Sequence, residues 1–357
     1  MFFLGDEGSD NASDPADFSE DTEIDQSSAE EQVDGIFGTT SDDVLRGTRG
    51  DDLIRGGDGD DTLSGAAGQD LITGDNGADA LNGDTGNDYL IGGQGEDTLN
   101  GGQGFDLLVG GSHDDLIFGG RGEDTLGGGD GMDELYGDSS NDVLFGGDDA
   151  DYLYGQAGHD LLVGGNGDDT LVGDDGDDTL FGGFTNFDGS VAGQTDHTAE
   201  TFYALGQLTE LDPNLANNGT PEEILASPIF ANFDTTDVLN AGTETGQDVL
   251  EGGPGDDLLV LGAGDNGSGG AGEDTFVLIA DSSTNEPIVL SDYDHTEDML
   301  IIDYDASGPA PTVSLADVGS NSVNLLLDGQ VVAILSSVGH SAVTLDDIRL
   351  VGIERSS

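Results

Sequence analysis

The chain has 357 residues, and 76 acidic residues against 6 basic ones give it a formal net charge of −70. This charge excludes nucleic acid as a partner, because binding to phosphates requires a basic surface, and it destabilises any compact state through self-repulsion. The chain has no Cys, so disulfides are excluded, and no apolar run approaches the roughly 20 residues of a transmembrane segment.

Residues 1–37 are rich in acids and carry no base. A segment with low hydrophobicity and high net charge cannot bury enough apolar surface to fold. We therefore predict an acidic, disordered N-terminal arm. The opening MFFLG lacks the basic region and the apolar length of a secretory signal peptide, so we expect export without an N-terminal signal, with a mature form already trimmed at its N-terminus as the alternative.

Residues 38–183 repeat one nine-residue phrase sixteen times, for example GGQGEDTLN at 92–100 and GGNGDDTLV at 164–172. Counted from Gly38, position one is Gly, position six is Asp and position eight is Leu or Ile in every copy. Position four is Gly except at Ser41, His113, Ser140 and Asp149. A fixed short period of this kind predicts a solenoid.

Each position of the phrase has a structural interpretation. Glycine at positions one and four indicates backbone angles that side chains forbid, so positions one to six predict a tight turn. Positions seven to nine predict a short strand whose position-eight residue points inward. Two phrases then complete one coil. The predicted fold class is all-β, a parallel β-roll (β-solenoid) with a short helical insertion and a C-terminal β cap.

The position-six aspartates must line up along the turns. Carboxylates stacked at strand spacing, about 4.8 Å, repel one another unless a cation lies between them, and a chain with six basic residues cannot supply it. Carboxylates and turn carbonyls together suit Ca²⁺, which takes about six to eight oxygen ligands in adaptable geometry. The predicted metal ligands are Asp43, Asp52, Asp61, Asp70, Asp79, Asp88, Asp97, Asp106, Asp115, Asp124, Asp133, Asp142, Asp151, Asp160, Asp169, Asp178, Asp248, Asp257 and Asp274.

The phrase resembles the repeat of the RTX (repeats-in-toxin) family, GGxGxDxUx, densely over residues 38–181 and more loosely over 243–277. The resemblance implies a parallel β-roll that holds several Ca²⁺ ions between successive turns. It also implies a secreted, extracellular protein that is exported by type I secretion through an uncleaved C-terminal signal. Given its charge, we expect the chain to be largely unfolded without calcium and folded with it.

The outward-facing positions carry two further features. Three of the six basic residues lie in the first two phrases: Arg46, Arg49 and Arg55. We interpret them as replacing metal at the open end of the roll, in preference to a binding role. Later phrases carry an apolar outer stripe that includes Phe118, Tyr136, Tyr152 and Tyr154. Either later segments cover this stripe, or it serves self-association or an unknown extracellular partner.

Residues 184–236 break the phrase and form an insertion. Apolar spacing predicts an amphipathic helix over 198–211, and the Thr-Pro-Glu-Glu sequence at 220–223 predicts the start of a second helix. The phrase returns over residues 237–280 as a second, short roll. Residues 261–268 are one residue short and place Asn266 near the acidic position, so a complete metal site is not expected there.

Residues 281–357 predict a β-rich cap, and this region loosely resembles the C-terminal cap and export region of the RTX family. Longer apolar strands follow one another, and Asp328-Gly329 between two of them predicts a hairpin turn. A short helix is expected from Thr344 to near Leu350. Asp292, Asp294 and Asp298 surround His295, and they form either a ligand cluster or, as we prefer, a solvated loop.

No catalytic motif emerges from the sequence. HExxH and GxSxG are both absent, and His113 and His159 lie at turn positions where we expect them to be solvated. We predict a calcium-binding structural or interaction protein without catalysis of its own. The alternative is an extracellular hydrolase or polysaccharide-modifying enzyme with its site in residues 184–236 or 281–357. A pore-forming toxin ranks last, because the chain lacks long apolar helices.

Overall fold

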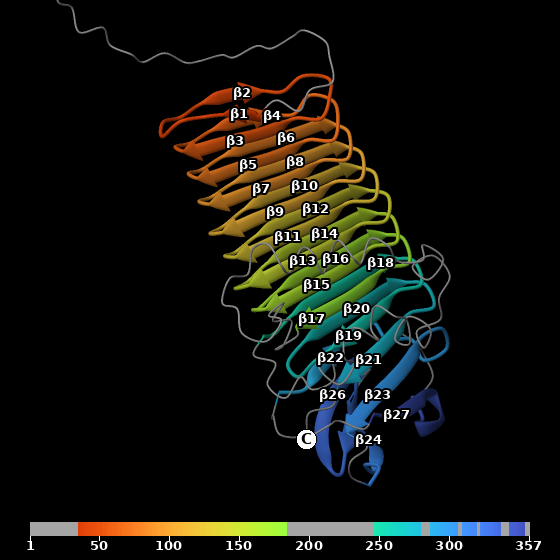
Figure 1. Ribbon diagram of the computed structural model, residues 1–357. Coiled ribbons are helices and arrows are strands. Elements are labelled where there is room, and N and C mark those ends of the chain that lie inside the picture. The colour runs from red at the N-terminus through yellow and green to blue at the C-terminus, as the bar shows by residue number, and fades with distance from the viewer. Residues whose placement is uncertain are drawn as a thin grey trace, which may run out of the picture.

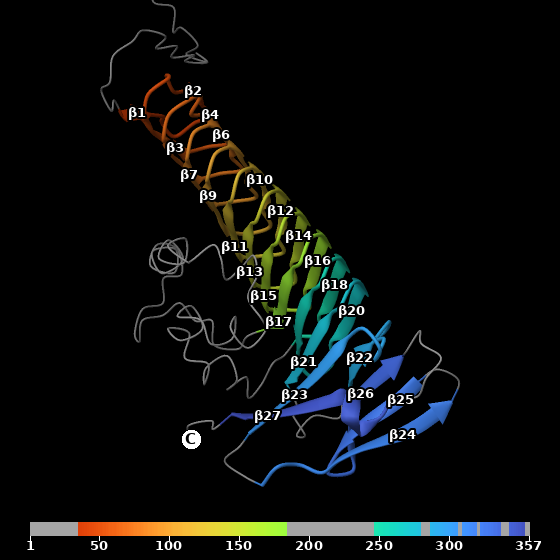
Figure 2. The same cartoon turned by 90° about the vertical axis from the view of Figure 1, so that its right-hand side faces the viewer.

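The structure is a computed structural model that describes residues 35–183, 246–279, 286–305, 309–319, 322–336 and 343–353. The predicted acidic arm up to residue 34 and the predicted helical insertion at 184–236 lie outside these residues. The described residues form a long stack of strands with a strand-rich end piece (Figure 1, Figure 2). None of them belongs to a helix with the length and apolar character that a membrane crossing requires.

Two sheets face each other along the stack. One consists, in spatial order, of β1 (Gly35–Phe37), β3 (Leu53–Asp58), β5 (Leu71–Asn76), β7 (Tyr89–Gln94), β9 (Leu107–Ser112), β11 (Thr125–Asp130), β13 (Val143–Asp148), β15 (Leu161–Asn166), β17 (Thr179–Gly183), β19 (Leu258–Leu261), β21 (Thr275–Ile279), β23 (Met299–Asp305) and β27 (Ile348–Ile353). The other consists of β2 (Val44–Arg46), β4 (Thr62–Ser64), β6 (Ala80–Thr85), β8 (Thr98–Gln103), β10 (Leu116–Arg121), β12 (Glu134–Ser139), β14 (Tyr152–Ala157), β16 (Thr170–Asp175), β18 (Val249–Pro254), β20 (Asn266–Ala271), β22 (Ile288–Leu290), β26 (Gln330–Ser336), β25 (Ser322–Leu327) and β24 (Val313–Gly319).

Consecutive strands alternate between the two sheets, so two phrases make one coil, and the predicted parallel β-solenoid is confirmed. Most repeat strands are longer than predicted. In β7, for example, the strand runs from position seven of one phrase to position three of the next, and both Leu90 and Gly92 face the interior. The predicted turn over positions one to six is therefore wrong in extent, because the position-one glycine lies inside the strand.

Position eight builds the core, as predicted. From Leu45 to Leu180, every position-eight side chain is at most 2% exposed. These side chains pair in register through the sheets, as Leu90 does with Leu108. Each buried Leu or Ile contributes roughly 1.5–3 kcal/mol relative to an exposed one, so the stack of identical coils is stabilised along its whole length.

The two stretches of repeats share both sheets. Leu171 of β16 lies opposite Leu250 of β18, and Leu180 of β17 lies opposite Leu259 of β19. The solenoid therefore continues across the insertion. In the shortened phrase, Gly267 takes the place of the core Leu, and a Cβ there would lie 2.6 Å from Cδ2 of Leu261, which fills the space.

The C-terminal residues end the solenoid with longer strands. The predicted hairpin is confirmed: β25 and β26 are antiparallel, and both Asp328 and Gly329 between them have positive φ, 50° and 89°. A helical segment begins after Thr344, as predicted, but its predicted extent to near Leu350 is wrong. Residues Leu345–Asp347 form one 3-10 turn, and the chain then enters β27, which pairs in parallel with β23.

Candidate metal site: two columns of buried aspartates

The position-six aspartates form two columns, one along each row of turns. In both columns the backbone N–H of each aspartate donates a hydrogen bond to Oδ1 of the aspartate one coil later. The first column is Asp43, Asp61, Asp79, Asp97, Asp115, Asp133, Asp151, Asp169, Asp248 and Asp265. The second is Asp52, Asp70, Asp88, Asp106, Asp124, Asp142, Asp160, Asp178, Asp257, Asp274 and Asp298.

Inside the columns the second carboxylate oxygen is buried without a hydrogen-bond partner. Asp106 is 3% exposed, its Oδ1 accepts the N–H of Asp88 at 2.7 Å, and its Oδ2 has no donor. The same is true of Oδ2 in Asp61, Asp70, Asp79, Asp88, Asp97, Asp115, Asp124, Asp133, Asp142, Asp151, Asp160, Asp169, Asp178 and Asp257. Leaving a buried acceptor unsatisfied costs about 1–3 kcal/mol, and more when it is charged. A row of such atoms needs an explanation.

Burial also disfavours the charged form of these carboxylates. Desolvation is the main cause that raises the pKa of Asp106 to about 7, and of Asp142 and Asp151 to about 9. Hydrogen bonds from the backbone oppose this rise, and neighbouring carboxylates add to it at Asp142 and Asp151. A cation beside Oδ2 would remove the penalty, because it would stabilise the ionised form.

A second row of oxygen atoms faces the unpartnered carboxylate oxygens. A Cβ on Gly101 would lie 2.6 Å from Oδ2 of Asp106 and 2.7 Å from the carbonyl oxygen of Gly119, one coil later. Position one is thus glycine because a carboxylate and a carbonyl occupy the side-chain space. In the part of the chain that the structure describes, no three His, Asp or Glu side chains converge. The donor set is one carboxylate plus backbone carbonyls, which suits a hard cation such as Ca²⁺.

The glycines at positions two and four are the ones that require unusual backbone angles. Gly102 at position two and Gly104 at position four have φ of 104° and 149°. His113 at position four keeps a positive φ of 84° despite its side chain. The prediction that glycine supplies unusual backbone angles is therefore correct for position four. The position-one glycine instead allows close packing. The positive φ at position two was not predicted.

Both columns end differently from their interiors. At the first phrase, Oδ2 of Asp43 accepts the backbone N–H of Thr39 at 2.6 Å and its hydroxyl at 2.9 Å. Thr48 makes the same two bonds to Asp52, at 2.6 and 3.1 Å. These two predicted ligands already have donors on Oδ2, the oxygen that lacks a donor in interior aspartates such as Asp106.

Sequence reasoning missed two column members at the other end. Asp265 is fully buried and takes the acidic position, near which Asn266 was expected. The phrase is one residue short, so its acidic position comes one residue earlier in the chain. Asp298 ends the second column, accepting the N–H of Asp274 at 3.2 Å. The shift of one residue could have identified Asp265. Nothing in the local sequence marks Asp298, which lies 24 residues beyond Asp274.

The other acids around His295 are dispersed. Asp292 accepts hydrogen bonds from the N–H groups of Gly269 and Gly270, at 3.1 and 2.9 Å. Oδ1 of Asp294 lies 3.8 Å from Nδ1 of His295. These acids therefore form neither the ligand cluster nor the solvated loop that the sequence suggested. Asp292 accepts hydrogen bonds from β20, and Asp298 accepts one from the second column.

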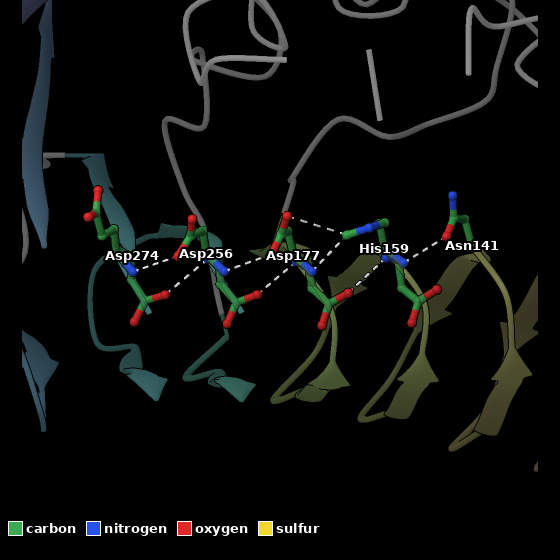
Figure 3. A network of polar contacts seen from close by, with 9 residues as sticks. Asn141, His159, Asp177, Asp256 and Asp274 are labelled. Carbon is green, nitrogen blue, oxygen red and sulfur yellow. Dashed lines mark hydrogen bonds and ion pairs between the residues drawn. The ribbon is translucent and has the colours of Figure 1, made fainter. Parts of the chain in front are cut away.

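An outer row of hydrogen bonds between position-five residues runs beside the second column (Figure 3). The N–H of His159 donates to Oδ1 of Asn141 at 2.9 Å, and the N–H of Asp177 donates to Nδ1 of His159 at 2.8 Å. The row continues to Asp256, whose N–H donates to Asp177 at 3.0 Å. His159, predicted to be merely solvated, therefore takes part in this row with Nδ1 as an acceptor.

The arginines of the first coils do not stand in for metal as predicted. Arg55 pairs with Asp75, a position-two residue on the outside of the next coil, through Nε and through Nη2 at 3.0 Å. The side chains of Arg46 and Arg49 are exposed. The threonines Thr39 and Thr48 satisfy Asp43 and Asp52 at the first end of each column.

The predicted aromatic stripe lies on the outer face of the sheet that contains β10, β12 and β14. The ring of Tyr136 stacks on Phe118 at 5.1 Å and on Tyr154 at 4.9 Å between centroids. The hydroxyl of Tyr136 donates a hydrogen bond to Glu134. This bond is the main reason that the pKa of Tyr136 is raised to about 12. Tyr152 is 50% exposed. Within this stack, Tyr136 has a ring against each of its two faces.

A protein-family model covers most of the repeat region. The model of the RTX calcium-binding nonapeptide repeat matches residues 37–72, 56–90, 73–108, 91–126, 127–162, 154–186 and 234–267, more than half of the chain. No curated protein matches. A solved structure, a hyperactive, Ca²⁺-dependent, β-helical antifreeze protein from an Antarctic bacterium, aligns over 77% of this chain and 89% of its own, with 18% identity and a TM-score of 0.29. The chain therefore belongs to the family of RTX calcium-binding nonapeptide-repeat proteins.

Proposed function

We propose that this protein is a secreted calcium-binding protein whose solenoid folds when Ca²⁺ enters the two aspartate columns. The supporting observation is the buried Oδ2 atom that lacks a donor in phrase after phrase, as in Asp106 and Asp115. The aspartates between the first and the last member of each column, together with carbonyls of the position-one glycines, would hold the ions. Bound Ca²⁺ supplies the positive charge that a chain with a net charge of −70 lacks.

The folding part of the proposal is tested on the full chain stripped of metal by a chelator. Titration with Ca²⁺ should convert coil to strand in far-UV circular dichroism and shrink the hydrodynamic radius cooperatively, because each coil contacts its neighbours. Mg²⁺ serves as the control and should act weakly, since it demands a stricter octahedron and retains water. A chain that is equally folded in chelator and in millimolar calcium would contradict the proposal.

Secretion is the second part of the proposal. Extracellular calcium modules work with dissociation constants of about 10⁻⁴ to 10⁻³ M, so a chain tuned to that range would stay unfolded until it left the cell. The export signal is proposed to lie in residues 281–357 and to use a type I system. Fusing these residues to a reporter and co-expressing a type I transporter should export the reporter, and retention of the fusion in the cell would count against this route.

In the third part of the proposal, the protein acts as a structural or interaction module without catalysis of its own. The proposed contact surface is the aromatic stripe, where Tyr152 is half exposed beside stacked Tyr136 and Tyr154, and its occupant is a second copy or an extracellular partner. Sedimentation of the calcium-loaded chain, compared with a Tyr152→Ser variant, tests self-association. A concentration-independent monomer in both samples would exclude self-association.

A further inference from the structure

The ends of the aspartate columns share one arrangement that the interiors lack. At the first coil, the N–H groups of Thr39 and Thr48 donate to Oδ2 of Asp43 and Asp52, both at 2.6 Å. Their hydroxyls add second bonds at 2.9 and 3.1 Å. Oδ2, which has no donor in interior aspartates such as Asp106, here accepts from two donors.

The far ends of both columns repeat this arrangement with other residues. The N–H of Gly262 donates to Oδ2 of Asp265 at 2.7 Å, and the N–H of Asp294 donates to Oδ2 of Asp298 at 2.6 Å. Asp294 precedes Asp298 by four residues, the same spacing as Thr39 and Asp43. Each column is thus closed at its first and its last aspartate by a backbone N–H.

The backbone at position two distinguishes the two kinds of phrase. In the fifteen uninterrupted phrases whose Oδ2 lacks a donor, position two has a positive φ: Gly57, Ala66, Asp75, Asp84, Gly93, Gly102, Gly111, Gly120, Gly129, Asp138, Gly147, Gln156, Gly165, Asp174 and Gly253. None of the four described donors at the column ends, Thr39, Thr48, Gly262 and Asp294, has a positive φ. A β-branched residue such as Thr strongly resists positive φ.

We propose that both calcium columns end in hydrogen-bonded caps that take no calcium, and that the backbone at position two decides whether a phrase is a cap or a site. With positive φ the N–H of position two does not engage the carboxylate, and Oδ2 is left for a cation. Without it the N–H takes the place of the cation. This inference rests on the proposed function, and it removes Asp43 and Asp52 from the predicted ligands.

The coil that follows Asp52 offers the same kinds of oxygen atom as the coil that follows an interior aspartate. A Cβ on Gly47 would meet Oδ2 of Asp52 and the carbonyl oxygen of Gly65 in the next coil, as a Cβ on Gly101 would meet Asp106 and its next coil. The oxygens of an interior site are thus present here. Thr48 occupies position two here, where the phrase of Asp106 has Gly102.

The test counts bound calcium in the full chain by equilibrium dialysis at saturating free Ca²⁺, with circular dichroism as the folding control. Asp106→Asn should bind at least one ion fewer than the unsubstituted chain, whereas Asp52→Asn should bind the same number. An equal loss in both variants would overturn the cap inference and leave the calcium function intact. If the unsubstituted chain binds no calcium, both the proposed function and the inference fail.

A second pair of variants tests the role of position two. Thr48→Gly permits a positive φ and should add one bound ion, because the N–H can turn away from Asp52. Thr48→Val removes the hydroxyl but keeps a β-branched residue and its N–H, so its count should stay unchanged. An unchanged count in Thr48→Gly, or a gain in Thr48→Val, would show that the position-two backbone does not make this choice.

Discussion

The backbone N–H of Asp88 donates a 2.7 Å hydrogen bond to Oδ1 of Asp106, eighteen residues further along the chain. One carboxylate oxygen thereby fixes the register between two coils, and the other lies with the carbonyl oxygen of Gly119 beside Gly101. The position-six aspartate thus has two functions that a neutral residue could not combine. An asparagine could still accept the N–H, but it would carry no charge for a cation.

The close approach of Gly101 to this carboxylate gives the first prediction. In Gly101→Ala the new Cβ would lie 2.6 Å from Oδ2 of Asp106 and 2.7 Å from the carbonyl oxygen of Gly119. We expect the variant to lose calcium affinity and about 1–3 kcal/mol of stability. The matched control is Gly50→Ala, where nothing lies within 4 Å of the new Cβ. Urea unfolding in calcium should leave the control within about 0.5 kcal/mol; equal effects would contradict the assigned contact.

The raised pKa values predict how the metal-free chain responds to pH. Burial raises the pKa of Asp61 to about 6 and of Asp142 to about 9, whereas an unfolded Asp titrates near 3.9. Because the folded pKa is the higher one, the proton favours the folded state. This stabilisation is full below about pH 4 and is lost as the pH rises through about 6 to 9.

The corresponding measurement is circular dichroism in chelator from pH 9 to pH 5. Strand content should increase as the pH falls, because neutral carboxyls neither repel one another nor demand a cation. With saturating calcium the dependence should be reversed, since protons then compete with the ion. A metal-free chain that is more folded at pH 9 than at pH 5 would show that the aspartates are not buried as described.

Strain at position two gives a prediction about stability. Ala66 has a φ of 78°, in the left-handed region that costs a residue with a side chain about 1–2 kcal/mol. Ala66→Gly should therefore stabilise the calcium-bound chain by up to about 1 kcal/mol. Ala157→Gly, at a position without positive φ, should destabilise it by about 0.5–1 kcal/mol. The two shifts in the urea midpoint should have opposite signs, and shifts of the same sign would refute the strain.

The core predicts a further contrast between two strand residues. Leu126 is fully buried, whereas Tyr152 is 50% exposed on the outer face. Leu126→Ala should destabilise the chain by about 2–5 kcal/mol through the cavity it leaves. Tyr152→Ala should cost about 1 kcal/mol or less, because little buried surface is lost. Comparable losses would mean that the position-eight residues do not form the core.

Much of the fold was accessible from the sequence because one period governs both local and long-range structure. The spacing of Asp97 and Asp115 is two phrases, and it fixes the strand register as well as the column. Position eight required only the alternation of strand side chains to be assigned to the core. In proteins without such a repeat, long-range contacts join residues that have no regular spacing in the sequence.

The parts that escaped prediction depend on interactions outside the period. The hydrogen bond between Asp274 and Asp298 spans a segment without repeats, so sequence spacing could not place Asp298. The 3-10 turn after Thr344 is followed by a strand because β23 provides a parallel edge for it. The hydrogen bonds of Thr39 and Thr48 to Asp43 and Asp52 could not be predicted, because the sequence does not show which carboxylate oxygen lacks a donor.

The central claim is tested most directly by anomalous diffraction from crystals grown in calcium. Two rows of calcium peaks should appear along the turns, each about 2.3–2.6 Å from an Oδ2 atom of an interior column aspartate such as Asp106. No peak should lie beside Oδ2 of Asp52. Columns without peaks, with Oδ2 of Asp106 hydrogen-bonded to a backbone N–H instead, would contradict the account.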